Sequence, residues 1–266
     1  MGKETATKER PRAEQTEVLK SGEKRIGNRN GPDGRIKLTL PEELAIFEEG
    51  RGPVVESFRR LKTKLLNCRQ EPPQVIIITS PVASDGKSFV AMNLAQTFSH
   101  DPDGRTLLID ADLRRPTLDQ WLDPPPEQGL AEVLNGELEP EKGICKLEGS
   151  ALRVLPAGQP TDDPLTGFGS QRCSEVFKKL RHWYRRIIVD CPPILPVVDA
   201  DLLSAQADGV LLVVRSENTP RAGVTRALSS FNKEALLGVV FNGTRRSIAD
   251  WLRQPSGRYY HYYRSK

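Results

Sequence analysis

Short apolar runs alternate with amphipathic segments along most of this 266-residue chain. The runs, such as Val75–Ile78 and Val210–Val214, do not alternate with polar residues, which is typical of strands buried on both faces of a parallel sheet. The segments between them repeat apolar residues at three- and four-residue spacing, as in Val54–Asn67, and predict helices. This order indicates a doubly wound, mostly parallel α/β sheet, in which ligands bind at the carboxyl ends of the strands.

The elements can be assigned to residue ranges from this pattern and from the Pro, Gly and Asp residues that interrupt it. The predicted strands are Gln74–Thr79, Thr106–Asp110, Ala151–Leu155, Arg186–Asp190, Gly209–Val214 and Leu237–Phe241. The predicted helices are Val54–Asn67, Lys87–Phe98, Gln171–Tyr184, Asp199–Ala205 and Pro220–Phe231. The predicted loops are Asp123–Gln128 and Gly158–Gly169.

The composition divides the chain into three parts. Residues 1–35 are rich in charged residues, Gly and Asn and lack apolar periodicity, so we expect a disordered segment. Residues 36–245 form the predicted domain, with 36–49 as a weakly structured approach to the first helix. Residues 246–266 form a basic tail that contains many tyrosines.

A Gly86-Lys87-Ser88 tripeptide lies between a predicted strand and the helix that begins at Lys87. This is the setting of a phosphate-binding loop, in which backbone N–H groups and the helix N-terminus hold phosphates. Lys87 is then expected to reach the β- and γ-phosphates of ATP, and Ser88 to bind Mg²⁺. The full pattern has glycine where this chain has Pro81. The alternative is an ordinary helix start capped by Ser84 or Asp85.

Three aspartates follow predicted strands. Asp110 and Asp112 end one strand, and Asp190 ends another. They are expected to meet at the sheet edge that also carries the tripeptide, where carboxylates hold Mg²⁺ and accept a proton from a hydroxyl. The alternative for each one is a loop aspartate that caps the next helix.

The tail combines tyrosines with positive charge. Four of the five tyrosines, Tyr259, Tyr260, Tyr262 and Tyr263, lie in the last eight residues. Between Arg245 and Lys266 the Lys and Arg residues outnumber the acids, which are represented by Asp250 alone. We interpret the tyrosines as phosphoacceptors. Each phosphate adds about −1.5 to −2 charges, and four phosphates would more than reverse the balance. The alternative is a plain interaction tail that binds a membrane or nucleic acid.

The overall composition excludes several classes of protein. The net charge of +4 is too small to indicate nucleic acid, and we expect no such partner. No apolar run approaches the roughly 20 residues of a membrane helix, and no signal peptide is evident. The four cysteines have no metal-site spacing and are interpreted as reduced thiols of a cytosolic protein.

Several motifs together resemble one family, the bacterial tyrosine kinases (BY-kinases) that regulate export of capsular and extracellular polysaccharide. The matching segments, in chain order, are ITSPVASDGKSFVAMNLAQ, LLIDADLRRP, GLAEVLNG, LPAG, IIVDCPP, VVDADLL, ADGVLLVV and LLGVVFN. LLIDADLRRP is similar to the Walker A′ motif, which distinguishes this family and its Min- and Par-type relatives among P-loop NTPases.

The resemblance implies roles for individual residues. Catalysis is implied for Lys87, Asp110 and Asp112, with Asp110 as the base for the tyrosine hydroxyl. Metal binding is implied for Ser88, Asp112 and Asp190. Nucleotide contacts are implied for Ser84, Asp85, Gly86, Lys87, Ser88, Phe89 and Asn242, the last near adenine. Glu56, Arg59 and Lys62 match an E-x-x-R-x-x-R oligomerisation motif.

The resemblance also implies partners, and the chain departs from the family at three places. The resemblance implies a homo-oligomeric ring, a membrane adaptor that acts as a polysaccharide chain-length regulator, a tyrosine phosphatase, and a peripheral position at the inner face of the plasma membrane. Ala83-Ser84-Asp85 stands where the family often has Pro-Gly-Glu, so a flexible glycine is missing. Lys62 replaces an arginine and cannot form a bidentate pair. The third departure is at the family's Asn-Pro segment after LPAG, for which Asp163-Pro164 is the nearest match.

The expected function is ATP-dependent autophosphorylation on the tyrosine tail. The core motifs also fit a Min- or Par-like ATPase switch or scaffold without kinase activity. Par-type relatives carry a second lysine early in the P-loop, where this chain has Pro81, Val82 and Ala83, and the tyrosine tail favours the kinase. A catalytically inactive scaffold is the third possibility.

Overall fold

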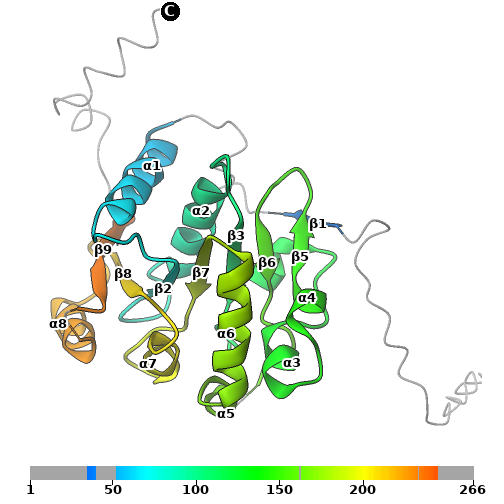
Figure 1. Ribbon diagram of the computed structural model, residues 1–266. Helices are drawn as coiled ribbons and strands as arrows, with labels where there is room; N and C mark the ends of the chain where they lie inside the picture. The colour runs from blue at the N-terminus through cyan, green and yellow to red at the C-terminus, as the bar shows by residue number, and fades with distance from the viewer. Residues whose placement is uncertain (1–34, 40–51, 162, 233, 245–266) are drawn as a thin grey trace, which may run out of the picture.

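A nine-stranded, mostly parallel sheet runs through the domain, with helices on both faces (Figure 1). The computed structural model describes residues 35–39, 52–161, 163–232 and 234–244. The strand order is β4-β1-β5-β6-β3-β7-β2-β8-β9. The predicted disordered segment at 1–35 falls almost entirely outside the described residues, and the predicted tail at 246–266 does so completely.

The six strands predicted from the apolar runs are neighbours in the sheet, from β6 to the edge strand β9. They are β2 (Val75–Thr79), β3 (Thr106–Asp110), β6 (Arg153–Leu155), β7 (Arg186–Asp190), β8 (Gly209–Arg215) and β9 (Leu236–Asn242). All pairs among them are parallel. Every residue of β2 and β3 is buried, which explains why these strands have no polar alternation.

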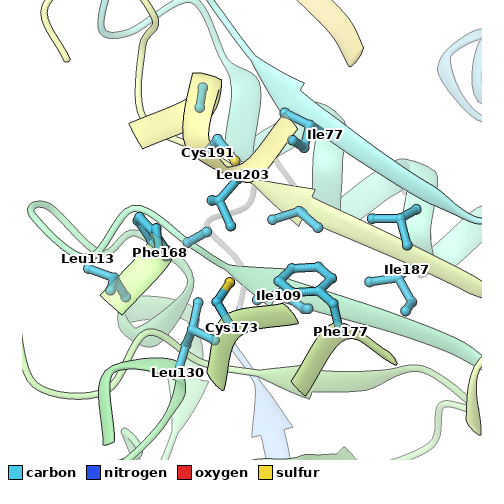
Figure 2. Close-up of a cluster of buried hydrophobic side chains, with 14 of the residues drawn as sticks. Ile77, Ile109, Leu113, Leu130, Phe168, Cys173, Phe177, Ile187, Cys191 and Leu203 are labelled. Atoms are coloured by element: carbon cyan, nitrogen blue, oxygen red, sulfur yellow. The ribbon is translucent and has the colours of Figure 1, made fainter. Parts of the chain in front are cut away.

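Two apolar cores lie on opposite faces of the sheet. The helices α1 (Pro53–Leu66) and α2 (Lys87–Ser99) cover the face to which Ile76, Ile78 and Leu108 point. The other face carries α3 (Leu130–Asn135), α5 (Pro164–Phe168), α6 (Gln171–Trp183), α7 (Asp199–Ser204) and α8 (Arg221–Ser230). On that face, Phe177 and Cys173 of α6 pack among Ile109 and Ile187 (Figure 2).

The sheet is wider than the apolar runs predicted. The additional strands and short helices are β1 (Arg35–Leu38), β4 (Leu122–Asp123), β5 (Cys145–Leu147), the 3-10 helix η2 (Leu118–Trp121) and α4 (Pro140–Gly143). Two expectations are therefore wrong: residues 36–38, predicted to be a weakly structured approach, belong to a strand, and the predicted loop Gly158–Gly169 contains α5. β1 pairs antiparallel with β4 and parallel with β5, so its conformation depends on distant partners.

Two further expectations can be compared with the structure. All four cysteines are free thiols, and three of them are buried. Within the described ranges, no helix is both long enough and apolar enough to cross a bilayer.

Candidate active site

The loop between β2 and α2 has the shape of a phosphate-binding loop. α2 begins at Lys87, directly after Gly86, whose φ of 88° is left-handed. Among the residues that the structure describes, no side chain caps this helix start with a hydrogen bond, so the alternative of an ordinary cap by Ser84 or Asp85 is wrong. The first N–H groups of the helix are therefore left for an anion.

Two residues of this loop adopt conformations that favour glycine. Gly86 is one, and a Cβ atom there would also overlap the Asn242 amide. Ser84 is the other, with φ of 67°, at the place where the family resemblance indicated a missing glycine. A non-glycine residue in this region carries strain of about 1–2 kcal/mol. The loop keeps the conformation of a phosphate-binding loop, although the strained backbone of Ser84 raises its free energy.

Lys87 lies among carboxylates. Its Nζ atom is 3.0 Å from Asp112 Oδ2 and 3.5 Å from Asp190 Oδ1, and all three side chains are buried. Burial alone would lower the pKa of Lys87, but the charges of Asp190 and Asp112 outweigh it and raise the pKa above its ordinary value. The lysine is thus held protonated in this site.

Asp190 is a buried acid compensated by the charge of Lys87. Its residue is 0% exposed, and among the described residues neither carboxylate oxygen has a hydrogen-bond partner. Burial raises its pKa, and Lys87 opposes that rise. A buried carboxylate without hydrogen bonds is unfavourable unless a cation is nearby.

Asp110 lies beside Asp190 because β3 and β7 are parallel neighbours with these two residues in register. Its Oδ1 accepts the N–H of Asp112 at 3.0 Å, and its Oδ2 accepts those of Thr117 at 3.1 Å and Leu118 at 3.0 Å. Burial, reinforced by the charge of Asp190, raises its pKa well above the ordinary value. Asp110 is therefore a basic carboxylate that also organises the loop after β3.

The oxygen atoms at this site fit a magnesium ion whose remaining ligands are water and phosphate oxygens. Asp112, Asp190 and the Ser88 hydroxyl are buried oxygen donors around one lysine, and hard oxygen ligands suit Mg²⁺. Within the described ranges, no three His, Cys, Asp or Glu side chains form a complete metal cluster. Mg²⁺ typically takes one or two protein carboxylates and completes its shell with water and substrate phosphates, so these residues are compatible with it.

Asn242 contacts the P-loop. Its Nδ2 atom donates to the Asp85 carbonyl at 3.0 Å, and its Oδ1 accepts the Gly243 N–H at 2.9 Å. Phe89 has its ring against Phe58 of α1, with centroids 5.9 Å apart, so its backbone N–H is the group available to a phosphate. The structure thus brings Asn242 to the loop, and packs Phe89 against α1, through contacts that the sequence did not predict.

The sequence also missed polar contacts that hold the site. Thr219 donates to Asp85 Oδ1 at 2.6 Å, and Arg215 donates to the Ser84 carbonyl at 3.1 Å. Arg114, in the loop after β3, pairs with buried Asp199 of α7 at 3.0 and 3.4 Å. In the sequence, Thr219 stands out only because it precedes Pro220 and a predicted helix. That position indicates the start of a helix and not a contact with the P-loop.

The predicted oligomerisation residues do not form one exposed cluster. Glu56 lies 3.8 Å from Arg59 and 3.7 Å from Arg60 on the outer side of α1. Lys62 instead pairs with Asp101 and donates to the Thr97 carbonyl of α2 at 3.4 Å. The four candidate phosphoacceptor tyrosines lie outside the described residues.

Known proteins resemble this chain over most of its length. A family model described as an AAA domain matches residues 74–235. Tyrosine-protein kinase YwqD of Bacillus subtilis is 32% identical over 195 residues, which cover 72% of this chain and 82% of YwqD. This chain belongs to the bacterial tyrosine-kinase family.

Longer members of the family contain a segment like this chain. The succinoglycan biosynthesis transport protein ExoP of Rhizobium meliloti is 33% identical over 224 residues, or 80% of this chain. The matched part is 28% of ExoP, so the chain spans less than a third of that relative.

Solved structures confirm the predicted fold class. The chimerical protein CapA2B2 superposes with a TM-score of 0.73 at 29% identity and covers 79% of this chain and 93% of its own. The cell division ATPase MinD of Pyrococcus furiosus gives a TM-score of 0.55 at 27% identity and covers 69% of this chain and 76% of its own. The fold is therefore that of a P-loop NTPase of the Min/Par-like type.

Proposed function

We propose that this protein is a tyrosine autokinase that transfers the γ-phosphate of ATP to tyrosine hydroxyls of its own tail. One observation carries the proposal: the three strand-end aspartates and Lys87 meet beside a phosphate loop with an uncapped helix start. Membership of the tyrosine-kinase family adds the class of acceptor.

The phosphates would be held by the chain's own loop. The N–H groups from Ser84 to Phe89 and the start of α2 supply donors, and Lys87 supplies a fixed positive charge. Ser88, Asp112 and Asp190 would hold Mg²⁺, which neutralises charge on the phosphate oxygens when bound. Lys87, now paired with Asp112, would exchange that partner for a phosphate oxygen.

Asp110 is the proposed proton acceptor. In the transfer, the phenol oxygen forms a bond to the γ-phosphorus, the bond to the β,γ-bridging oxygen breaks, ADP leaves, and the phenolic proton passes to the carboxylate. The raised pKa of Asp110 suits this role. Because Asp110 is fully buried under the backbone of Thr117 and Leu118, this segment has to open before a phenol can reach it.

The proposed substrates are Tyr259, Tyr260, Tyr262 and Tyr263. An extended chain covers about 3.3–3.6 Å per residue, so the roughly twenty residues after Asn242 reach on the order of 65–70 Å, enough for a neighbouring active site. The fifth tyrosine, Tyr184, packs against the core, and burial raises its pKa. Tyr184 is therefore a poor acceptor.

We propose that phosphorylation regulates synthesis and export of extracellular or capsular polysaccharide. ExoP is a biosynthesis transport protein for such a polymer, which supports this role. The partners would be a membrane adaptor or chain-length regulator, a tyrosine phosphatase and further copies of this chain in a ring. The basic tail favours a peripheral position at the anionic inner face of the plasma membrane.

Incubation with Mg-ATP followed by mass spectrometry tests the proposal. We expect phosphotyrosine at the tail of the wild-type chain and none in Asp110→Asn. The likeness to MinD favours a second candidate, an ATPase switch. Sustained ATP turnover without phosphotyrosine, with a membrane activator present, would decide for that second function.

A further inference from the structure

Three side chains from the β8–β9 edge of the sheet hold the P-loop, and none belongs to a phosphate-binding motif. Arg215 Nη1 donates to the Ser84 carbonyl at 3.1 Å, and Asn242 Nδ2 donates to the Asp85 carbonyl at 3.0 Å. Thr219 Oγ1 donates to Asp85 Oδ1 at 2.6 Å. Arg215, Thr219 and Asn242 thus connect this edge of the sheet to the P-loop.

Thr219 has both of its hydrogen-bonding functions in use. Its oxygen accepts the backbone N–H of Arg215 at 3.0 Å, which leaves the hydroxyl hydrogen for Asp85. The hydroxyl thus joins the end of β8 to the P-loop. A methyl group in its place would remove both hydrogen bonds with almost no change in volume.

Asp85 depends on that hydroxyl. Its residue is 0% exposed, and within the described residues its Oδ2 has no hydrogen-bond partner. Loss of the Thr219 hydrogen bond would leave a buried carboxylate without a side-chain donor, which costs more than the hydrogen bond itself contributes. The loop would shift so that Asp85 can reach water.

The backbone beside Asp85 needs this support. Ser84 and Gly86 flank it, with left-handed φ values of 67° and 88°. Such backbone persists only where its surroundings fix it. The two hydrogen bonds to Asp85 and the one to Ser84 therefore hold the part of the loop that precedes the phosphate-binding helix.

We propose that Thr219 is a positioning residue for the nucleotide: through Asp85 it fixes the loop conformation that presents backbone N–H groups to the phosphates. This inference rests on the proposed function, because it assigns Thr219 a part in Mg-ATP binding. It extends the binding apparatus to the loop between β8 and α8, which carries no phosphate motif.

The test compares substitutions of equal size in the full chain. Calorimetric titration with Mg-ATP is expected to give a dissociation constant about tenfold weaker for Thr219→Val, in line with loss of one hydrogen bond to a charged group. Thr219→Ser should stay within about twofold of wild type, since it keeps the hydroxyl. Thr225→Val, on the exposed side of α8, is the matched control and should not change the affinity.

Hydrogen exchange without nucleotide provides an independent measurement. Amides of residues 82–88 should exchange faster in Thr219→Val than in wild type or Thr219→Ser. If the valine variant does not fold, Thr219→Ala takes its place in both assays. If wild type binds no Mg-ATP, the proposed function fails and exchange alone decides the role of Thr219. Unchanged affinity or unchanged loop exchange in a folded variant would overturn the inference.

Discussion

Lys87 Nζ lies 3.0 Å from Asp112 Oδ2, so the cation expected to bind phosphate is paired with a carboxylate expected to hold metal. Binding of Mg-ATP would separate this pair, because the lysine has to turn to the phosphates while the aspartate receives the metal. The pair keeps a buried lysine and a buried aspartate compensated until nucleotide arrives.

Lys87→Met should weaken Mg-ATP binding by well over tenfold, which corresponds to more than about 1.4 kcal/mol. Removal of the ammonium group eliminates a phosphate ligand and leaves the carboxylates around it uncompensated. Lys179→Met, on an exposed lysine that pairs with Glu139, is the control and should bind normally. An unchanged affinity in folded Lys87→Met, measured by calorimetry, would remove the P-loop assignment.

Ser84→Gly should raise the free energy of unfolding by about 0.5–1 kcal/mol, because glycine adopts a φ of 67° without strain. Ala83, the neighbouring residue, does not have a left-handed φ, so Ala83→Gly relieves no strain. It should lower the free energy of unfolding, because glycine increases the conformational entropy of the unfolded chain. Denaturant unfolding of the two variants gives the comparison. If both substitutions destabilise equally, the backbone at Ser84 is not strained in solution.

Substitutions in α1 should have two different effects, one on assembly and one on stability. Glu56→Ala with Arg59→Ala should reduce an assembly to monomers in light scattering, since both lie on the outer side of the helix. Lys62→Ala should mainly lower the unfolding temperature, because this lysine pairs with Asp101 within the subunit. An oligomer that survives the first change would show that the motif has another role here.

Stability should depend on pH through Asp119. Burial raises the pKa of Asp119 to about 6, above its value of about 4 in an unfolded chain. A raised folded pKa means that the native state binds the proton more tightly, so the contribution of Asp119 to stability is fully present below about pH 4 and is lost as the pH rises through about 6. Asp119→Asn should remove this fall and be more stable at pH 7 by on the order of 1–2 kcal/mol.

Thermal unfolding across pH 4–7 measures the effect of Asp119, with Glu148→Gln on an exposed side chain as control. The amide oxygen introduced by Asp119→Asn can still accept the Ala157 N–H, which Asp119 accepts at 3.2 Å, while the second backbone donor to Asp119, the Gly158 N–H, is the contact that the substitution can weaken. Parallel curves for wild type and Asp119→Asn would contradict the raised pKa.

The sequence predicted the features that depend on buried, continuous strands. Asp110 and Asp190 were placed at one edge because each ends an apolar run, and β3 and β7 are indeed neighbours. β1 and β4 were missed because strands of four and two residues are specified by their partners rather than by their own pattern.

Within the site, the sequence identified the candidate catalytic and metal-binding residues. It did not identify the residues whose hydrogen bonds keep the P-loop in place. Lys87 stands in a recognisable tripeptide, and its neighbours follow from strand order. The hydrogen bond from Thr219 to Asp85 joins residues 134 positions apart, and no periodicity or spacing connects them. Lys62 was assigned to an interface, whereas in the structure its ammonium group contacts the Thr97 carbonyl of α2 and Asp101 just after that helix.

The most direct test of the kinase assignment mixes two full-length chains with Mg-ATP. One carries Tyr→Phe at Tyr259, Tyr260, Tyr262 and Tyr263 with an intact site, and the other carries Lys87→Met with an intact tail. Mass spectrometry should find phosphate on the tail tyrosines of the Lys87→Met chain and none on its Tyr184. No phosphotyrosine on that chain, while the intact site still hydrolyses ATP in the presence of a membrane activator, would contradict the account.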